Sequence, residues 1–288
     1  PVKLVWDCCH KTYLSYNGIK KQLKQRTSRS NYEKWKREFL SYQKTKKKTK
    51  RAEKRLLKKL LRYLLRLLNL HKELIESKSV KLSNKEIVEM LTITEVYSQQ
   101  HSKVYGQVEQ IKDRIVSLSK PYIRPIVRGK ETKSVEFGAK VNKLQVDGIS
   151  FIEHFSYDAF NEGTRLKNCI GLHQQLFGKC THHSGDKIYA TNANRSYCSS
   201  KKIITNFEPK GKQKVQHIEQ SKIMRNALNK ERGTRLEGSF GNEKNHYLLQ
   251  KVNARNAITE KCWIFFGIMT ANAAIIANRK QAAIKAAA

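Results

Sequence analysis

The N-terminal part of the chain has the hydrophobic spacing of helices. Four aromatic residues recur at intervals of three or four, which predicts a helix over 31–45. They are Tyr32, Trp35, Phe39 and Tyr42. A second helix is predicted over 46–77, where eight leucines lie on one side. Apolar residues at helical spacing predict further helix over 78–112.

The helix predicted over 46–77 is basic as well as amphipathic. Its leucines alternate with Lys58, Lys59, Arg62 and Arg66. If helices pack through the leucines, the basic face stays in solvent, and it can also lie along DNA phosphates. The two interpretations are compatible. A helix lying on a membrane surface is a third interpretation.

From Arg114 onward the hydrophobic period falls to two, as in strands. Short strands are predicted at 115–116 and 126–127, and alternation continues over 135–141. Strand-like runs on both sides of Asp147 and Gly148 predict a β-hairpin with a tight turn.

Helical and β-type segments then alternate. The sequence predicts a helix over 158–177, a β-type pair over 187–189 and 203–207, and a basic loop over 209–215. Residues from about 220 to 285 are predicted to be helical, with a glycine-rich interruption at 238–241. We therefore expect an α/β fold in two parts, a basic helical segment over 1–112 and a domain over 113–288.

The charge of the chain indicates the kind of partner it meets. Its 288 residues include 58 Lys and Arg against 24 Asp and Glu, a formal net charge of +34. Residues 1–72 hold 23 of the basic residues and four of the acidic ones. Such a protein repels itself unless it meets a polyanion, and nucleic acid is the usual one. An enzyme acting on small neutral metabolites would not need this charge.

The sequence predicts no membrane span, because no apolar run reaches about 20 residues. No signal peptide is recognisable either. Six scattered cysteines fit a reducing cytoplasm. Four residues, Cys180, His182, His183 and Cys198, do not have the spacing of the usual zinc sites.

Acidic residues are scarce, so carboxylates in apolar settings are candidates for chemistry. Asp186 is predicted at the edge of a strand and Glu237 at the start of a helix. Lys244 follows Glu237 by seven residues, which places it two turns along the same face. Together they could hold a metal ion beside a DNA phosphate. A strand-end turn or an ion pair would also explain Asp186, and the helix dipole would explain Glu237.

Residues from about 113 to 278 resemble the insertion-sequence DDE transposases. The resemblance rests on five segments in order: RPIVRGK at 124–130, VEFGAK at 135–140, FNEG at 160–163, GDKIY at 185–189 with Asn194 and Arg195, and LEGSFG at 236–241 with Lys244 and Tyr247. It implies a ribonuclease H-like core, a mixed sheet flanked by helices, with C-terminal helices from about 220. The basic segment 1–112 then resembles the helical insertion of such enzymes.

The resemblance implies that Asp186 is the second catalytic aspartate and Glu237 the catalytic glutamate. In a complete enzyme they would help to hold two Mg²⁺ or Mn²⁺ ions. Lys244 would position a phosphate, and Arg232 and Arg235 would contact DNA. The implied reaction is hydrolysis of double-stranded DNA at the element's ends, followed by transfer of the freed strand to target DNA. Such enzymes act in the bacterial cytoplasm on the nucleoid, and commonly as homodimers on paired ends.

The sequence departs from the family pattern in two places. Lys230 and Gly233 stand where the family has Tyr and Arg, and Arg232 is one residue out. The family's first catalytic aspartate lies on a strand that precedes the helical block, so we expect it upstream of Pro1. We therefore expect a truncated and impaired transposase.

Two other interpretations stay open. Asp147 or Asp113 could replace the missing carboxylate, although turn chemistry explains an Asp-Gly pair at 147–148. The competing functional class is a non-catalytic basic protein that binds nucleic acid through charge alone.

Overall fold

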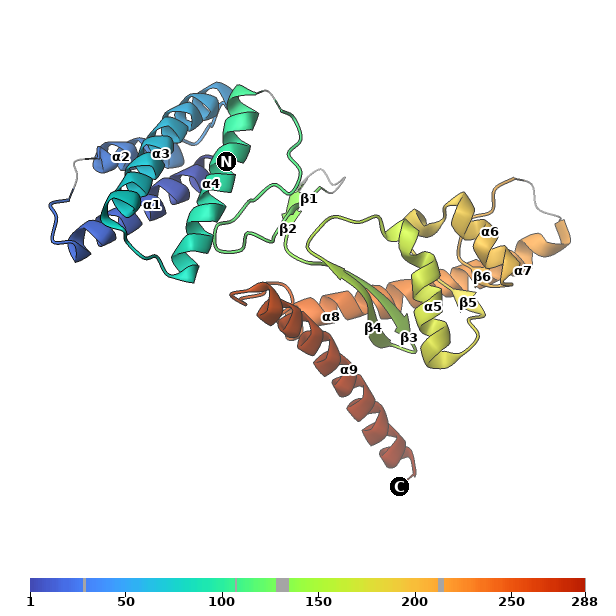
Figure 1. Ribbon diagram of the computed structural model, residues 1–288. Helices are drawn as coiled ribbons and strands as arrows, with labels where there is room; N and C mark the ends of the chain where they lie inside the picture. Colours follow the sequence, from blue (N-terminus) through green and yellow to red (C-terminus); the bar gives the residue numbers. More distant parts are fainter. Residues whose placement is uncertain (28–29, 107, 128–134, 212–214, 288) are drawn as a thin grey trace. The chain divides into compact units, whose positions relative to one another are not determined.

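The computed structural model describes residues 1–27, 30–106, 108–127, 135–211 and 215–287 (Figure 1). Helices predominate over short strands, so the broad α/β class is confirmed. The chain divides into two compact units, Pro1–Gly138 and Ala139–Ala288. Unit 1 thus includes residues 113–138, which the sequence assigned to the second domain.

Unit 1 is built on four helices within its described residues: α1 (Val2–Gln22), α2 (Tyr32–Lys44), α3 (Lys50–Lys78) and α4 (Asn84–Tyr105). The last three confirm the helices predicted from hydrophobic spacing. Side chains define where two of them begin. The Thr49 hydroxyl accepts the Ala52 N–H at the start of α3, and Ser83 and Glu86 form a capping box at the start of α4.

The leucine side of α3 forms the centre of unit 1. Leu60 and Leu64 are fully buried, together with Val5 of α1 and Ile93 of α4. Because burial of this face stabilises the unit, α3 keeps its basic side in solvent.

The β-type segments of unit 1 follow α4. Strand β1 (Pro125–Val127) pairs antiparallel with β2 (Val135–Phe137), which confirms the strand predicted at 126–127. The strand predicted at 115–116 is wrong. Ile115 is buried against the helical core instead, and its N–H donates to Gln99 Oε1 at 2.9 Å. Positions 128–130 of the family-like segment lie outside the described residues.

Unit 2 begins with the predicted hairpin. Strands β3 (Lys140–Val146) and β4 (Ile149–Ser156) pair antiparallel around Asp147 and Gly148. These two residues have φ angles of 47° and 80°, as a type I′ turn requires. The predicted helix over 158–177 is present as a 3₁₀ turn, η1 (Glu162–Arg165), followed by α5 (Leu166–Phe177).

A small parallel pair comes next. Strand β5 (His182–His183) pairs with β6 (Ile204–Thr205), and α6 (Asn192–Ser200) lies between them in sequence. The strand predicted at 187–189 is wrong, because these residues form the 3₁₀ turn η2 (Lys187–Tyr189). Tyr189 turns toward the hairpin, and its hydroxyl donates to Asn142 Oδ1 at 2.7 Å. The described strands thus form three two-stranded sheets, not the continuous mixed sheet that was expected.

The C-terminal part is helical, as predicted. Helix α7 (Val215–Glu231), the π-helical turn η3 (Arg232–Glu237) and α8 (Gly238–His246) follow without a break (Figure 1). The interruption predicted at 238–241 is therefore wrong. Glu243 in α8 is buried against Lys143 of β3, and this packing holds the helix together despite its glycines.

The last helix, α9 (Ala257–Ala287), is the one helix of the described residues that is long and apolar enough to cross a membrane. Length and composition are weak evidence, because core helices of soluble proteins have the same properties. In unit 2, Ile264, Ile268 and Ala271 of α9 are buried. This single, weakly apolar helix is compatible with a soluble protein.

Candidate functional site

Asp186 lies just beyond the C-terminal end of β5. Ends of this kind in parallel sheets are common ligand sites. Asp186 is exposed, and its Oδ1 accepts the Lys187 N–H at 2.6 Å, which caps η2. Within the described part of the chain, no cation forms an ion pair with it. The strand-end turn considered from the sequence is therefore present, and it leaves the carboxylate open to solvent.

The Asp186 loop is tied to helix α7 by an asparagine. Gly185 N–H donates to Asn206 Oδ1 at 3.0 Å, and Asn206 Nδ2 donates to Gly185 O at 2.9 Å. The same Nδ2 donates to Asn229 Oδ1 at 2.8 Å. Ser184 Oγ also donates to Leu228 O at 2.8 Å. Two independent contacts therefore join the loop to the last turns of α7.

Glu237 lies farther along the same continuous helix, at the end of the π-helical turn. A π-helix makes its hydrogen bonds between residues five apart. The turn accordingly brings Arg232 Nη1 within 2.8 Å of Glu237 Oε1. The Glu237 side chain is 56% exposed. The Arg232 charge, expected to contact DNA, is thus paired with the proposed catalytic glutamate.

Lys244 occupies the position expected from its spacing. Helix α8 is regular from Gly238 to His246, so Lys244 lies about 10 Å along the axis from Glu237, on the same side. Lys244 is exposed. A Cβ atom added at Gly238 or Gly241 would have no neighbour within 4 Å. At these two glycines the helix carries no side chain, so another chain can approach its backbone closely there.

The two carboxylates are carried by connected segments, but they do not form a metal cluster together. Leu228 and Glu237 are nine residues apart, roughly 13 Å along a helix axis. Among the described residues, no group of three or more His, Cys, Asp and Glu side chains could hold a metal ion. Mg²⁺ is commonly held by one or two carboxylates and completes its shell with water and phosphate. The exposed oxygens of Asp186 and Glu237 fit that donor set.

Arg235 and Asp147 are engaged with each other. Arg235 Nη1 lies 2.7 Å from Asp147 Oδ1, and Arg279 Nη1 lies 3.0 Å from Asp147 Oδ2. The hydrogen bond from Arg235 and the charge of Arg279 hold the pKa of Asp147 below its usual range. These two ion pairs join the hairpin turn to the π-helical turn and to α9. They favour the structural explanation of Asp147 over a catalytic one.

Unit 2 also contains a buried ion pair that was not predicted from the sequence. Lys143 Nζ lies 2.5 Å from Glu243 Oε1, and the side chains are 1% and 5% exposed. Lys143 also donates to Ser239 Oγ at 2.8 Å. Burial lowers the pKa of Lys143, and Glu243 opposes part of that change. Lys143 is buried because a register shift in β3 follows Asn142 and breaks the alternation that a sequence pattern relies on.

The basic residues predicted on α3 have different surroundings. Lys59 is paired with Glu38 at 2.9 Å, whereas Lys58 lies over the Tyr105 ring at 5.3 Å. Arg62 and Arg66 are exposed, and neither forms an ion pair with any described residue.

The cysteines and histidines considered for zinc have different surroundings. Cys180 and Cys198 are buried in an apolar cluster with Leu166 and Phe207. Burial lowers the pKa of His183 to about 4, so its ring is neutral near pH 7. Its Nε2 atom is buried, and no described residue hydrogen-bonds to it.

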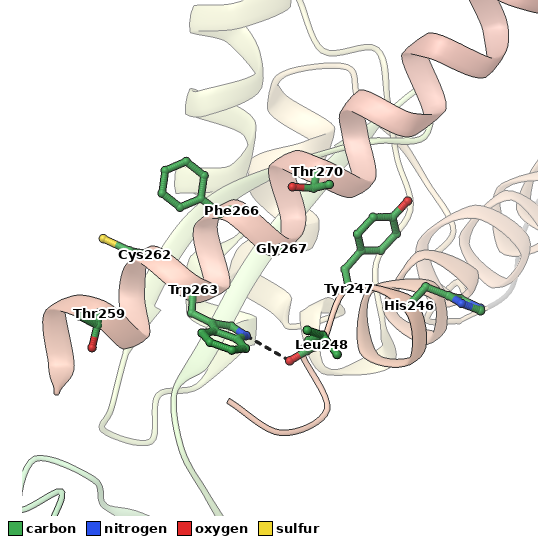
Figure 2. A pocket seen from close by; sticks show the side chains of 9 residues that line it. All are labelled: His246, Tyr247, Leu248, Thr259, Cys262, Trp263, Phe266, Gly267 and Thr270. Atoms are coloured by element: carbon green, nitrogen blue, oxygen red, sulfur yellow. Dashed lines mark hydrogen bonds between the residues drawn. The ribbon is translucent and has the colours of Figure 1, made fainter. Parts of the chain in front are cut away.

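Among the described residues, two pockets of unit 2 can be compared with the candidate site. One, of about 270 Å³, is lined in part by Arg235, Ser239 and Glu243. A larger apolar pocket of about 540 Å³ lies between the end of α8 and α9, where Trp263 Nε1 donates to Leu248 O (Figure 2). Neither Asp186 nor Glu237 lines the larger pocket. The exposed carboxylates of Asp186 and Glu237 therefore lie outside both of these pockets.

No protein-family model, no curated protein and no solved structure matches this chain.

Proposed function

We propose that the protein is a DNA transposase of an insertion sequence. It would hydrolyse phosphodiester bonds with Mg²⁺ or Mn²⁺ and transfer the freed strand to target DNA. The observation that supports this proposal most is the attachment of the Asp186 loop to the helix that carries Glu237 and Lys244. One helix thereby carries the exposed carboxylate of Glu237 and the exposed ammonium group of Lys244, and it is joined to the loop of Asp186.

Each residue of the candidate site would have a role that follows from its chemistry. Asp186 and Glu237 would each supply carboxylate oxygens to a divalent ion. Bound metal would activate the attacking oxygen and stabilise the leaving one. Lys244 would hold a neighbouring phosphate on the bare side of α8. Without metal, the Arg232 guanidinium pairs with the Glu237 carboxylate. If Glu237 bound a metal ion instead, Arg232 would be released and could bind a phosphate.

The proposal includes a ribonuclease H-like core, two metal ions, and action on double-stranded DNA in the bacterial cytoplasm, with a homodimer on paired ends. The hairpin β3–β4 and the pair β5–β6 are separate two-stranded sheets. Each leaves strand edges at which a further strand could add.

A non-catalytic nucleic-acid-binding protein is the second candidate. It is favoured by the lack of a three-residue metal cluster in the part of the chain that the structure describes. The net charge of +34 is common to both candidates and does not separate them.

Substitution of the carboxylates separates the two candidates. We expect slow Mn²⁺-dependent nicking of supercoiled plasmid DNA that is lost in Asp186→Asn and in Glu237→Gln. Both variants should bind DNA as the parent protein does. Glu219→Gln, at an exposed position of α7, removes the same charge and should nick normally. Nicking that survives both substitutions, or no metal-dependent nicking by the parent protein, would favour the non-catalytic candidate.

A further inference from the structure

We propose that one surface of unit 1, the basic edge, binds the phosphate backbone of duplex DNA. The basic edge runs from the corner between α2 and α3 along one side of α3. It consists of Lys44, Lys46, Lys47, Lys48, Arg51, Arg55, Lys58, Arg62 and Arg66. Between residues 44 and 66 the chain has 12 basic residues and one acidic residue, Glu53.

The α3 part of the basic edge is a straight line of cations. From Arg51 to Arg66, five cations follow one another at steps of four, three, four and four residues, which keeps them on one side of a helix. Fifteen residues of helix span roughly 22 Å. One DNA strand carries a charge about every 3.4 Å of axis, so this line faces about six phosphates.

The charges of the basic edge are not neutralised within unit 1. Among the described residues, none of its nine cations forms an ion pair. Lys59, by contrast, is paired with Glu38 and therefore does not belong to the edge. Lys48 and Lys58 lie over the rings of Tyr42 and Tyr105, at 5.8 and 5.3 Å from the ring centroids. Such contacts position the ammonium groups and leave their net charge in place.

The packing of α3 favours DNA over a membrane surface. A helix that lies on lipid needs a free apolar face. In α3 that face is buried in unit 1, where Leu56 and Leu57 are 7% and 6% exposed and Leu64 is fully buried. Leu65, at 41%, is the one α3 leucine with high exposure. The choice of duplex DNA as the polyanion rests on the proposed function, but the surface does not depend on the carboxylates of unit 2.

Two charge-matched triple variants test the basic edge. The edge variant carries Arg51→Gln, Arg55→Gln and Arg62→Gln. The control variant carries Lys78→Gln, Lys81→Gln and Lys85→Gln, at exposed positions near the far end of α3. Both lose three positive charges from unit 1, and glutamine keeps the helix propensity of the replaced residues. Far-UV circular dichroism and thermal unfolding confirm that both variants fold.

The measured quantity is the affinity for a 20-base-pair duplex as a function of salt, in buffer with chelator and without metal. Each lost phosphate contact makes the negative slope of log K against log salt shallower by about 0.9. The slope of the edge variant should therefore be about 2.7 shallower than that of the parent protein. That corresponds to a roughly 500-fold weaker affinity at 0.1 M salt. The control variant should keep the parent slope to within about 0.5.

Two results would overturn the proposal. Equal changes in the edge and control variants would mean that binding follows total charge and not this surface. An unchanged affinity of the edge variant for DNA, with lost binding to phosphatidylserine vesicles, would assign the edge to a membrane. Because no metal is present, neither result bears on cleavage by Asp186 and Glu237, and loss of cleavage would not bear on this surface.

Discussion

Removing Glu243 should weaken unit 2 strongly, because it would leave a buried cation without its counter-ion. Lys143 is 1% exposed, and in Glu243→Gln its remaining contacts include the hydroxyls of Ser239 and Ser150, the ring of Phe240 and the new amide oxygen. Breaking a buried ion pair from one side costs about 3–5 kcal/mol. The amide still accepts a hydrogen bond, so we expect about 3 kcal/mol, a large part of the ~5–15 kcal/mol that stabilises a domain.

The double variant Lys143→Met/Glu243→Leu provides the matched comparison. Replacing both partners with apolar side chains of similar size removes the unpaired charge, so its stability should lie within about 1 kcal/mol of the parent. The single variant Lys143→Met should lose at least as much free energy of unfolding as Glu243→Gln does. A double-mutant cycle with the single variants Lys143→Met and Glu243→Leu should then give a coupling energy of several kcal/mol. Hydrogen exchange of the β3–β4 amides in increasing urea measures the free energy of opening at this site.

The pH dependence of Glu243→Gln gives a second readout. Burial already lowers the pKa of Lys143, and the substitution removes the carboxylate that raises it. A lysine with a lowered pKa in the folded state binds fewer protons than in the unfolded chain. The stability of the variant should therefore rise as pH increases from 7 toward 10. Additive single substitutions, or a flat pH response, would show that Lys143 and Glu243 do not interact as the structure indicates.

Two further predictions concern other parts of unit 2. Burial lowers the pKa of His183 from 6.5 to about 4, so the unfolded chain binds the proton first as pH falls. Stability should decrease by about 2 kcal/mol between pH 7 and pH 4.5, and His183→Leu should remove most of this dependence in urea titrations. Among the glycines, a Cβ at Gly163 would overlap the backbone oxygen of Ile188, whereas one at Gly238 meets nothing. Gly163→Ala should cost about 1–3 kcal/mol and Gly238→Ala should add about 1 kcal/mol, and equal thermal shifts in the two variants would contradict this.

Local chemistry explains which elements could be predicted from the sequence. The β3–β4 hairpin depends on an Asp-Gly turn whose φ angles are set by those two residues. Helix α3 depends on leucines repeated within one segment. Helix α1 was not assigned its own range, because its buried residues include Val5, Cys8 and Cys9, which favour helix only through packing against α3.

Contacts between distant residues explain what could not be predicted. The 187–189 segment has strand-like side chains, but Tyr189 bonds to Asn142, 47 residues earlier. The glycines at 238 and 241 resemble a helix break, yet the pair between Lys143 and Glu243 joins residues 100 apart. In the candidate site, Asp186 and Glu237 could be singled out by scarcity and spacing. The link through Asn206 to Asn229 depends on the fold and had no sequence signal.

The proposed chemistry depends most directly on whether Asp186 and Glu237 each bind a divalent metal ion. Replacing Mg²⁺ with Fe²⁺ and adding ascorbate and peroxide makes a bound ion cut the polypeptide next to itself, whether or not the protein cleaves DNA. In the presence of duplex DNA we expect cuts at 184–188 that Asp186→Asn suppresses and cuts at 235–239 that Glu237→Gln suppresses, and excess Mg²⁺ should suppress both. Cuts at only one of these segments, at other segments, or none at all would contradict the claim.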